Sequence, residues 1–426
     1  MPSKPDSPAP AAGGVRPAPL WAVLAFTFLA SAGTGVATTG VPFLAESAYG
    51  FGEIPIFVLA ALYGAVYVPG ALLVGPALRR AARRHAWLTT RRLLAALTLA
   101  LGLFAALPLL TRPAEGEAGT LAGTWAIWLL AIANGLLSGA SWPIVESYLS
   151  GGRRGERLRH ATGLFNITWS SSLVATLIAL GPFVHGRPLE ALAAMLPVYA
   201  ACAILTLWMG REPARSLPDE HPTRPAAYRR LLAVFRVQLP ASFLLLAVLE
   251  PVAPFLMARV GIEDPWAAPA AAIWLATRLA TFVVFARWGG WHGRWRTPIL
   301  AAALMLLGFA GVTIGPTLDA AAGRTLLLGG LAVLGCGVGM VYAAALYYAM
   351  EVGDAEIDAG GRHEAFIGLG YTAGPVLGVL AYVVAAPRGP LAASPTLLLL
   401  GLVGSIMIVL CLGSVAWACR SSRGPE

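Results

Sequence analysis

The sequence predicts an all-α membrane protein that crosses the bilayer twelve times, and three observations support this. Hydrophobic residues make up 58% of the 426 residues, a larger share than a soluble chain can shield from water. Charged residues make up only 12%, about half the roughly 25% of a soluble domain. The apolar residues form twelve runs of about 20 residues, the length at which a helix spans a bilayer. Strands of a membrane barrel would be half as long and would alternate in polarity, so helices are predicted throughout.

The predicted spans form two groups of six, separated by the longest polar segment. The first group comprises 20–44, 54–78, 93–110, 122–149, 161–184 and 189–208. The second group comprises 237–257, 268–285, 298–314, 325–350, 365–384 and 397–417. The predicted organisation is therefore a disordered cytoplasmic tail (1–19), an N-terminal six-helix bundle (20–208), a cytoplasmic central loop (209–236), a C-terminal six-helix bundle (237–419) and a cytoplasmic tail (420–426).

The basic residues predict the orientation, because cytoplasmic loops are enriched in Lys and Arg. With the N-terminus in the cytoplasm, 24 of the 30 Lys and Arg residues fall in predicted cytoplasmic segments. The net charge of +9 therefore reflects orientation, and its spread over short loops argues against a nucleic-acid partner. We predict a multi-pass protein of the plasma or inner membrane with both termini in the cytoplasm.

The two halves also carry the signs of an internal repeat. At an offset of 200 residues, the fourth predicted span aligns with the tenth and pairs glycine with glycine and aromatic with aromatic: Gly135 with Gly335, Gly139 with Gly339, and Trp142 with Tyr342. Continuing the comparison places Trp169 opposite Tyr371 and Tyr67 opposite Arg278. A composition rich in Gly and Ala is the alternative explanation, but several matches in order favour a repeat.

The loop after the second predicted span reads Gly-Pro-Ala-Leu-Arg-Arg-Ala-Ala-Arg-Arg over 75–84. With two six-span halves joined by a basic loop, the chain resembles the major facilitator superfamily over residues 20–419. In that family the loop reads Gly-x-Leu-Ala-Asp-Arg-x-Gly-Arg-Lys, and its carboxylate helps to latch the cytoplasmic gate. Here Arg79 stands at the acidic position, so the resemblance implies a gate that latches by another contact. The family's antiporter motif is also missing from the fifth span, so drug–proton antiport is not implied.

A set of cytoplasmic gate residues follows from this resemblance and from one carboxylate. Glu146 lies near the cytoplasmic end of the fourth span, beside the basic segment 153–159, and is expected to form a gate ion pair or, alternatively, to bind substrate. The equivalent loop of the second half, 288–294, retains a Gly-Arg pair of the motif. The predicted gate comprises Glu146, Gly75, Arg79, Arg80, Arg83, Arg84, Gly293 and Arg294.

Ionisable residues at membrane depth are costly and therefore suggest function. Arg278 lies midway along the eighth span, where it must face water or a carboxylate. It is predicted to anchor an anionic group of a substrate, or alternatively to form a buried pair with Glu250. Glu250 is followed by Pro251 and Pro254, which free backbone carbonyls where a cavity can be lined. We predict that Glu250 couples transport to protons.

Polar and aromatic side chains complete the predicted substrate site. Asn166 and Trp169 share one face of the fifth span, and Tyr371 is the repeat counterpart of Trp169. Such groups can hydrogen-bond and stack on a polar solute; interhelical packing and hydrogen bonding are the alternatives. The predicted substrate-binding residues are Arg278, Asn166, Trp169, Tyr371, Tyr67 and Tyr342.

The resemblance implies a secondary transporter that moves a small organic solute by alternating access, with proton coupling left open. Arg278 favours an anionic or zwitterionic solute, and the aromatic residues favour a sugar or an amphiphile. The alternatives are a membrane-embedded lipid-handling protein or enzyme, or a non-transporting sensor on a carrier fold. The six His residues are scattered over loops and span ends, and the four Cys form no close pair, so no catalytic residue, metal or cofactor is predicted. The predicted partners are the solute, membrane lipids and protons, and the protein is predicted to be a monomer.

Overall fold

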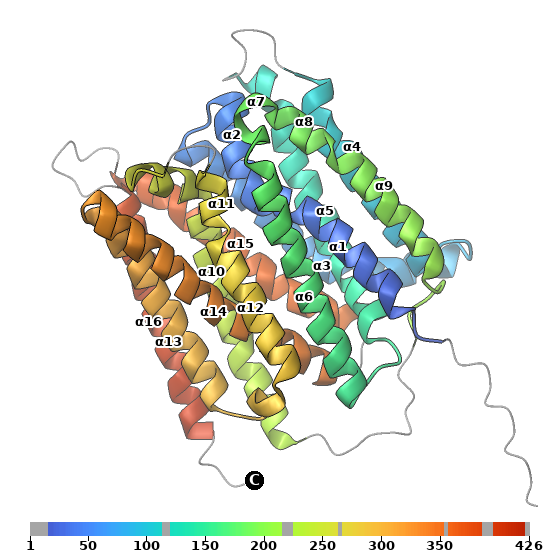
Figure 1. The fold of residues 1–426 in the computed structure, drawn as a ribbon. Helices are drawn as coiled ribbons and strands as arrows, with labels where there is room; N and C mark the ends of the chain where they lie inside the picture. The colour runs from blue at the N-terminus through green and yellow to red at the C-terminus, as the bar shows by residue number, and fades with distance from the viewer. Residues whose placement is uncertain are drawn as a thin grey trace, which may run out of the picture.

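The computed structural model describes residues 16–112, 120–214, 225–262, 266–352, 357–385 and 395–421. Twelve of its helical segments are long and apolar enough to cross a membrane, and the regular elements of these ranges are all helices (Figure 1). The twelve-span prediction is therefore confirmed. The predicted disordered tail falls mostly on residues 1–15, which lie outside the described residues.

The first half of the chain supplies six spans. The first span consists of α1 (Leu20–Gly35), the π-helical turn η1 (Val36–Gly40) and α2 (Val41–Tyr49). The next four are α3 (Glu53–Arg84), α4 (Thr90–Leu110), α5 (Leu121–Ser150) and α6 (Gly155–Leu180). After the short α7 (Phe183–Gly186), the sixth span comprises α8 (Pro188–Ala193), α9 (Met195–Leu205) and η2 (Thr206–Trp208).

The second half repeats this plan. Its first two spans are α10 (Ala226–Arg259) and the pair α11 (Ala267–Ala271) with α12 (Ile273–Arg287). After η3 (Gly289–Trp291), the third span comprises α13 (Arg296–Ile314) and η4 (Gly315–Thr317). The last three are α14 (Ala320–Val352), α15 (Ile357–Ala385) and α16 (Pro395–Ser421).

Several helices continue beyond the predicted spans at one end of the bundle, where most of the Arg residues gather. We call it the basic end; the starts of α6 and α10 mark it at the bottom of Figure 1. Here α3 continues to Arg84, α10 begins at Ala226 and α15 begins at Ile357. Residues 79–84 and 226–236, predicted as loops, are therefore helical. A hydropathy window stops at the first charged turn, whereas a helix continues through it because long Arg side chains reach the aqueous interface.

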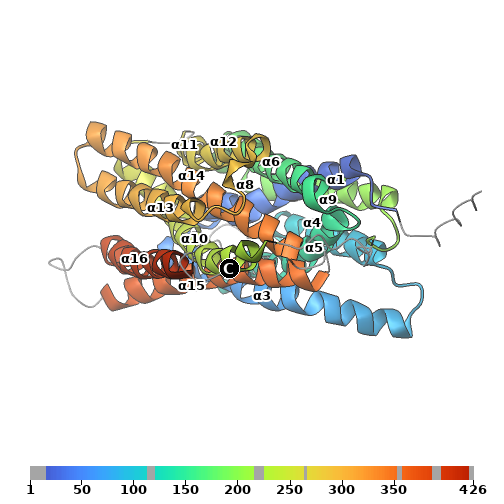
Figure 2. The same cartoon turned by 90° about the horizontal axis from the view of Figure 1, so that it is seen from below.

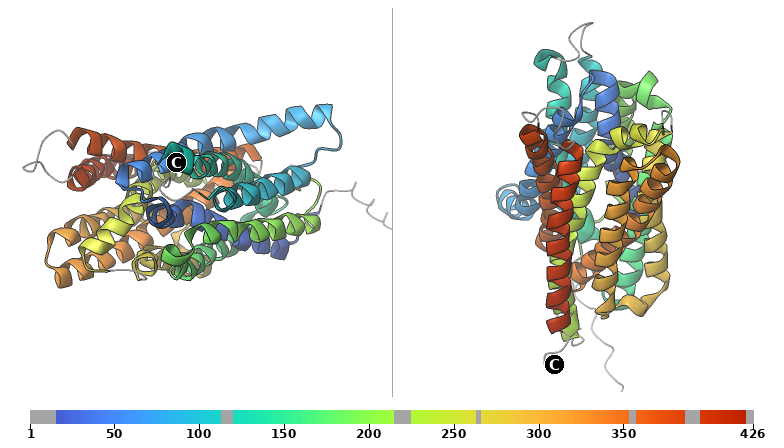
Figure 3. Two further views of the ribbon diagram at one scale, coloured as in Figure 1. Left: turned by 90° about the horizontal axis from the view of Figure 1, so that it is seen from above. Right: turned by 90° about the vertical axis from the view of Figure 1, so that its left-hand side faces the viewer.

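The two halves lie side by side, the first in blue to green and the second in yellow to red (Figure 2; Figure 3, left). Helices α3 and α5 of the first half pack against α15, and α6 packs against α12 and α14. The α3–α15 contact depends on glycine at two points. A Cβ on Gly64 would overlap the backbone of Tyr371, and one on Gly361 would meet the carbonyl oxygen of Ala71. Small residues let membrane helices approach this closely.

The internal repeat is visible as repeated packing. In each half, two glycines of the fourth span lie against the backbone of the second span. On α5 and α3 the pairs are Gly135–Tyr63 and Gly139–Tyr67, and on α14 and α12 they are Gly335–Trp274 and Gly339–Arg278. The glycines are 200 residues apart between halves and their partners 211 apart. Tyr67 and Arg278 therefore occupy equivalent positions, as the sequence comparison predicted.

Candidate functional site

A central cavity lies between the two halves. Its volume is about 60 Å³, measured as the space open to the centre of a water molecule, which is enough for several waters. Helices of both halves line it: α1, η1, α3, α5 and α6 on one side, and α10, α12, α14 and α15 on the other. Five of the six predicted substrate-binding residues are among the lining residues: Tyr67, Trp169, Arg278, Tyr342 and Tyr371.

Asn166, the sixth predicted residue, lies behind the cavity wall. It is buried, and its Oδ1 accepts a hydrogen bond from Nε1 of Trp169 at 3.2 Å. The two residues are one helical turn apart, so the bond fixes the indole on α6. Asn166 is therefore linked to the cavity through Trp169, and its substrate-binding role stays a prediction.

The guanidinium of Arg278 contacts two indole rings and is only 2% exposed. Its Cζ is 4.3 Å from the ring centroid of Trp169 and 4.6 Å from that of Trp274. Both contacts are cation–π interactions, in which the charge lies over the face of an indole. Its edge is different, because Nε and Nη2 are buried without a hydrogen-bond partner among the described residues. A planar fork of free N–H donors is suited to a carboxylate or phosphate.

Glu250 also lines the central cavity, but it does not form the buried ion pair with Arg278 that was the alternative prediction. Its Oε1 instead accepts a hydrogen bond from Oγ1 of Thr39 at 3.0 Å. Thr39 belongs to the π-helical turn η1 of the first half, so this bond joins the two halves. Single π-turns within α-helices are often found at functional sites, because they redirect side chains.

Sequence reasoning missed Trp274 and Thr39. Trp274 could have been found from the repeat, since it is the counterpart of Tyr63 at the same 211-residue offset that relates Tyr67 to Arg278. Thr39 carried a weaker signal, a Thr-Thr-Gly stretch within an apolar run. Only the packing of η1 on α10 places its hydroxyl against Glu250.

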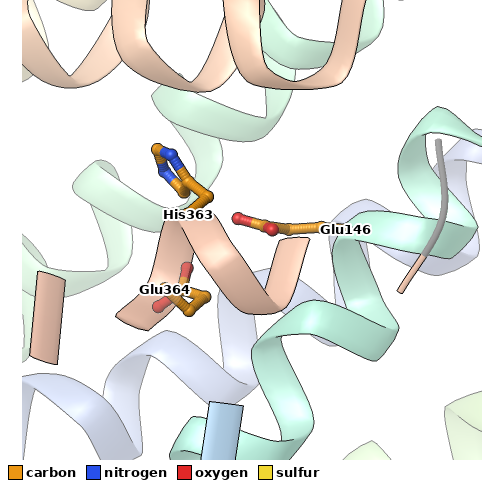
Figure 4. A group of neighbouring side chains, drawn as sticks. All are labelled: Glu146, His363 and Glu364. Carbon is orange, nitrogen blue, oxygen red and sulfur yellow. The ribbon is translucent and has the colours of Figure 1, made fainter. Parts of the chain in front are cut away.

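Three further ionisable side chains meet closer to the basic end, across the interface between the halves. Glu146 extends from α5 toward α15, which carries His363 and Glu364 (Figure 4). All three are at most 4% exposed, and each offers a donor atom within 4.8 Å of those of the other two. Glu364 accepts a hydrogen bond from the hydroxyl of Tyr67. Both oxygens of Glu146 and Nε2 of His363 are buried without a partner in the part of the chain described.

Glu146 and Glu364 form what we call the buried carboxyl pair. Two carboxylates this close repel one another when both are ionised, whereas one shared proton allows a hydrogen bond between them. The ion pair predicted between Glu146 and the basic segment 153–159 is therefore wrong, because Glu146 faces α15 instead. Glu364 was missed because its span was predicted to begin at residue 365, whereas α15 begins at Ile357.

The same three residues are the ones whose donor atoms converge enough to be considered as metal ligands. Histidine and carboxylates are both zinc ligands, but structural zinc sites take four protein ligands. Within the described ranges only Glu146, His363 and Glu364 make up this group. A proton shared between the carboxyls would give the unpartnered Glu146 a hydrogen bond to Glu364 without any further ligand.

The predicted gate residues on α3 lie at the basic end, and one of them, Arg79, forms an ion pair between the halves. Nη1 and Nη2 of Arg79 donate to Oδ1 and Oδ2 of Asp358 on α15 at 3.0 and 2.9 Å. A Cβ on Gly75 would collide with Asp358, so glycine makes room for this contact. The carboxylate missing from the loop motif is thus supplied by the opposite half. Arg80, Arg83 and Arg84 are exposed at the same helix end.

Reversing the charge of Arg79 should weaken closure of the basic end. The Arg79–Asp358 pair is partly solvent-exposed, and exposed pairs contribute about 0.2–1 kcal/mol. Arg79→Asp should therefore raise the open population by up to about fivefold, and Asp358→Arg in the same chain should restore closure. Spin labels at the exposed Ala82 and Arg296, on opposite halves, would report the distance. If Arg83→Asp has the same effect, the latch is not specific.

The second-half gate residues Gly293 and Arg294 lie in the turn between α12 and α13. Gly293 has a φ of +69°, which favours glycine, and its N–H donates to the hydroxyl of Tyr348 at 2.8 Å. Arg294 is exposed. The neighbouring His292 stacks on Trp291, outside the membrane-spanning segments. Burial, together with the Arg159 guanidinium of the first half, lowers the pKa of His292 to about 4.

This depressed pKa predicts a loss of stability at acid pH. Between about pH 6.5, the ordinary value for histidine, and about pH 4, the unfolded chain binds a proton that folded His292 excludes. The contribution of His292 to stability is therefore present above that window and is lost as the pH falls through it. His292→Gln should flatten the fall in Tm across this window, measured on detergent-purified protein. The exposed His85 provides the control, and His85→Gln should leave the slope unchanged.

Comparison with known proteins agrees with this architecture. Residues 23–357 match the profile of the family described as Major Facilitator Superfamily. No curated protein sequence matches the chain significantly.

Solved structures with the same fold include two transporters that are distant in sequence. The nucleoside transporter NupG has a TM-score of 0.62 at 14% identity, with 93% of this chain and 98% of that chain covered. The human organic anion transporter MFSD10 (TETRAN) has a TM-score of 0.59 at 13% identity, with 94% and 98% covered. These identities establish a shared fold alone. Because the family profile extends over most of the sequence, the chain belongs to the major facilitator superfamily.

Proposed function

We propose that the protein is a secondary transporter that moves an organic anion together with protons by alternating access. The observation that carries the proposal is the environment of Arg278, whose Cζ lies over the rings of Trp169 and Trp274 while its Nε and Nη2 have no hydrogen-bond partner among the described residues. A carboxylate or phosphate would satisfy that edge. The surrounding rings suit a solute with an aromatic or apolar body. The description of MFSD10 as an organic anion transporter is consistent with this class.

Alternating access would require contacts between the halves that open in turn on either side of the central cavity. Toward the basic end these contacts include Arg79–Asp358 and the buried carboxyl pair. Toward the other end, the ring of Phe57 packs against Gly378 and lies 5.9 Å from that of Tyr382. Each set could separate while the other holds, as two rocking bundles would require.

Glu250 is the group that would couple anion binding to protons. An anion bound at Arg278 shares the central cavity with this carboxyl, so an ionised Glu250 would repel it. Protonation of Glu250 removes that repulsion and keeps a hydrogen-bonding partner for Thr39. The chemistry therefore favours entry of one anion with a proton, which is symport.

Replacing Glu250 with glutamine should uncouple solute binding from pH. The amide keeps an acceptor for Thr39 but cannot ionise, so anion binding should no longer weaken as the pH rises. Uptake driven by a proton gradient should be lost, while anion exchange across proteoliposomes should persist. The half-buried Glu53 at the start of α3 does not line the central cavity and offers a control, since Glu53→Gln should leave both activities intact. An unchanged pH profile in Glu250→Gln would remove Glu250 from the mechanism.

We further propose that the basic end faces the cytoplasm of a plasma or inner membrane, with both termini on that side, and that the protein works as a monomer. The excess of Arg at this end supports the orientation. Labelling Arg83→Cys in intact cells and in inverted vesicles, after removal of the native cysteines, would test it. If Arg83→Cys reacts in intact cells but not in inverted vesicles, the basic end faces outward and the proposed orientation is wrong.

The solute class can be tested on purified protein in proteoliposomes. A panel of aromatic carboxylates and organic phosphates should exchange across the membrane, and the pH gradient should drive their accumulation. Nucleosides are the second class to include, because the rings of the central cavity could stack on a base and NupG is described as a nucleoside transporter. Exchange of nucleosides without any anion would overturn the assignment.

A further inference from the structure

A second cavity lies at the basic end, entirely within the second half, and we call it the basic-end cavity. Its volume of about 180 Å³ is three times that of the central cavity on the same measure. Helices α10, α14 and α15 enclose it, each with residues spaced three or four apart along one face. Ala345, Ala349 and Ala359 leave the space open because their side chains are short.

The charged residues of this cavity all carry, or can carry, positive charge. Arg236 on α10 and Arg362 on α15 both line it, and neither forms an ion pair within the described ranges. The described acidic residues of α14 and α15 are not among its lining residues. Glu364, for example, faces Tyr67. Two arginines at one cavity without a carboxylate form a site that attracts an anion.

His363 supplies an independent sign of a missing ligand. It lines the basic-end cavity and is only 4% exposed, yet its Nε2 has no hydrogen-bond partner in the described part of the protein. Buried polar atoms are nearly always paired, so an orphaned nitrogen indicates a partner that the protein does not itself provide. An imidazole N–H can donate to a phosphate oxygen, as the two guanidinium groups can.

We propose that the basic-end cavity binds a phosphate group, held by Arg236, Arg362 and His363. The group can come from an acidic phospholipid headgroup or from a soluble phosphate. The site is distinct from the proposed transport site, because the central and basic-end cavities share no lining residue. Its apolar residues, among them Leu239 and Phe366, lie beside the charges and suit the upper part of a lipid acyl chain. Such basic pockets between membrane helices are typical sites for anionic headgroups.

The test is equilibrium binding to the full-length protein, with no transport readout. Purified protein is placed in nanodiscs of phosphatidylcholine, with or without phosphatidylglycerol, and lipid binding is followed by native mass spectrometry and Tm. A second arm adds inorganic phosphate to phosphatidylcholine nanodiscs. Stabilisation by phosphatidylglycerol alone identifies a lipid site, and stabilisation by phosphate in the second arm identifies a site open to soluble phosphate. No effect of either on the wild-type protein overturns the proposal.

Variants then locate the site. Arg236→Gln and Arg362→Gln should each weaken binding by about tenfold, as expected when one charge-assisted hydrogen bond is lost. Arg362→Lys should retain most of the binding because it keeps the charge. Arg229→Gln is the matched control, since Arg229 is exposed on the same helix α10 and does not line the cavity. Equal losses in Arg229→Gln and Arg236→Gln would mean that general surface charge attracts the lipid, and would overturn the assignment.

Discussion

Replacing Arg278 with glutamine is expected to abolish anion binding and transport while leaving the fold intact. Arg278 lines the central cavity, and its Nε and Nη2 are buried donors that have no partner among the described residues and would face the proposed anion. Losing a buried charge that contacts an opposite charge costs about 2–5 kcal/mol, or roughly 30-fold or more in affinity. Isothermal titration of purified Arg278→Gln with an anion transported by the wild type would measure this loss.

The same variant separates a binding role from a structural one. Arg278 has no ion-pair partner among the described residues, so its burial is unfavourable until an anion arrives. The Tm of Arg278→Gln without solute should therefore equal or exceed that of the wild type. Arg287→Gln, an exposed change at the end of the same helix, should alter neither Tm nor binding. A large fall in the Tm of Arg278→Gln would instead indicate that the arginine holds α12 in place.

Neutralising the buried carboxyl pair is expected to keep the basic end closed at alkaline pH. When Glu146 and Glu364 are both ionised, charges within 4.8 Å repel by about 3 kcal/mol at an effective dielectric constant of about 20. That repulsion would open the interface between α5 and α15 as the shared proton leaves. Glu146→Gln and Glu364→Gln each remove one charge and should suppress the opening. Spin labels at Ala82 and Arg296 would report this opening as a change in the distance between them, measured by pulsed electron paramagnetic resonance across a pH series.

Two comparisons make this prediction specific. Glu156→Gln changes an exposed carboxylate near the start of α6 and should leave the pH response of the wild type unchanged. Adding Zn²⁺ tests the metal interpretation of the same residues, because a bound divalent cation would favour closure at every pH. If both Glu146→Gln and Glu364→Gln still open at alkaline pH as the wild type does, the carboxyl pair does not control the opening.

Much of the site was predictable because the bilayer constrains each span locally. Arg278 and Glu250 stand out in apolar runs, and the repeat related Tyr67 to Arg278 and Trp169 to Tyr371 before any contact was known. All five of these residues line the central cavity. The same reasoning failed where helices leave the apolar region. His363 was placed among the loops and span ends and Glu364 was missed, because hydropathy cannot distinguish a polar loop from a charged helical turn.

The pairings across the halves were beyond sequence reasoning. The sequence indicated that Arg79 had replaced an acidic residue, but its partner Asp358 is 279 residues away. Nothing in either segment identifies the other. The sequence also did not indicate that Glu250 pairs with Thr39 rather than with Arg278, because this pairing depends on how η1 packs against α10. A composition rich in Gly and Ala leaves many such packings possible.

The twelve spans, their division into two halves and the charges deep within the membrane could all be read from the amino-acid sequence. This was possible because burying a polar residue in lipid is unfavourable along each span, independently of its neighbours. Which buried groups meet depends on the folded structure. In it Arg278 contacts two indoles, Glu146 lies close to Glu364, and the ion-pair partner of Arg79 is on the opposite half. These pairings depend on which faces of distant helices come together, and that is a property of packing rather than of any local segment.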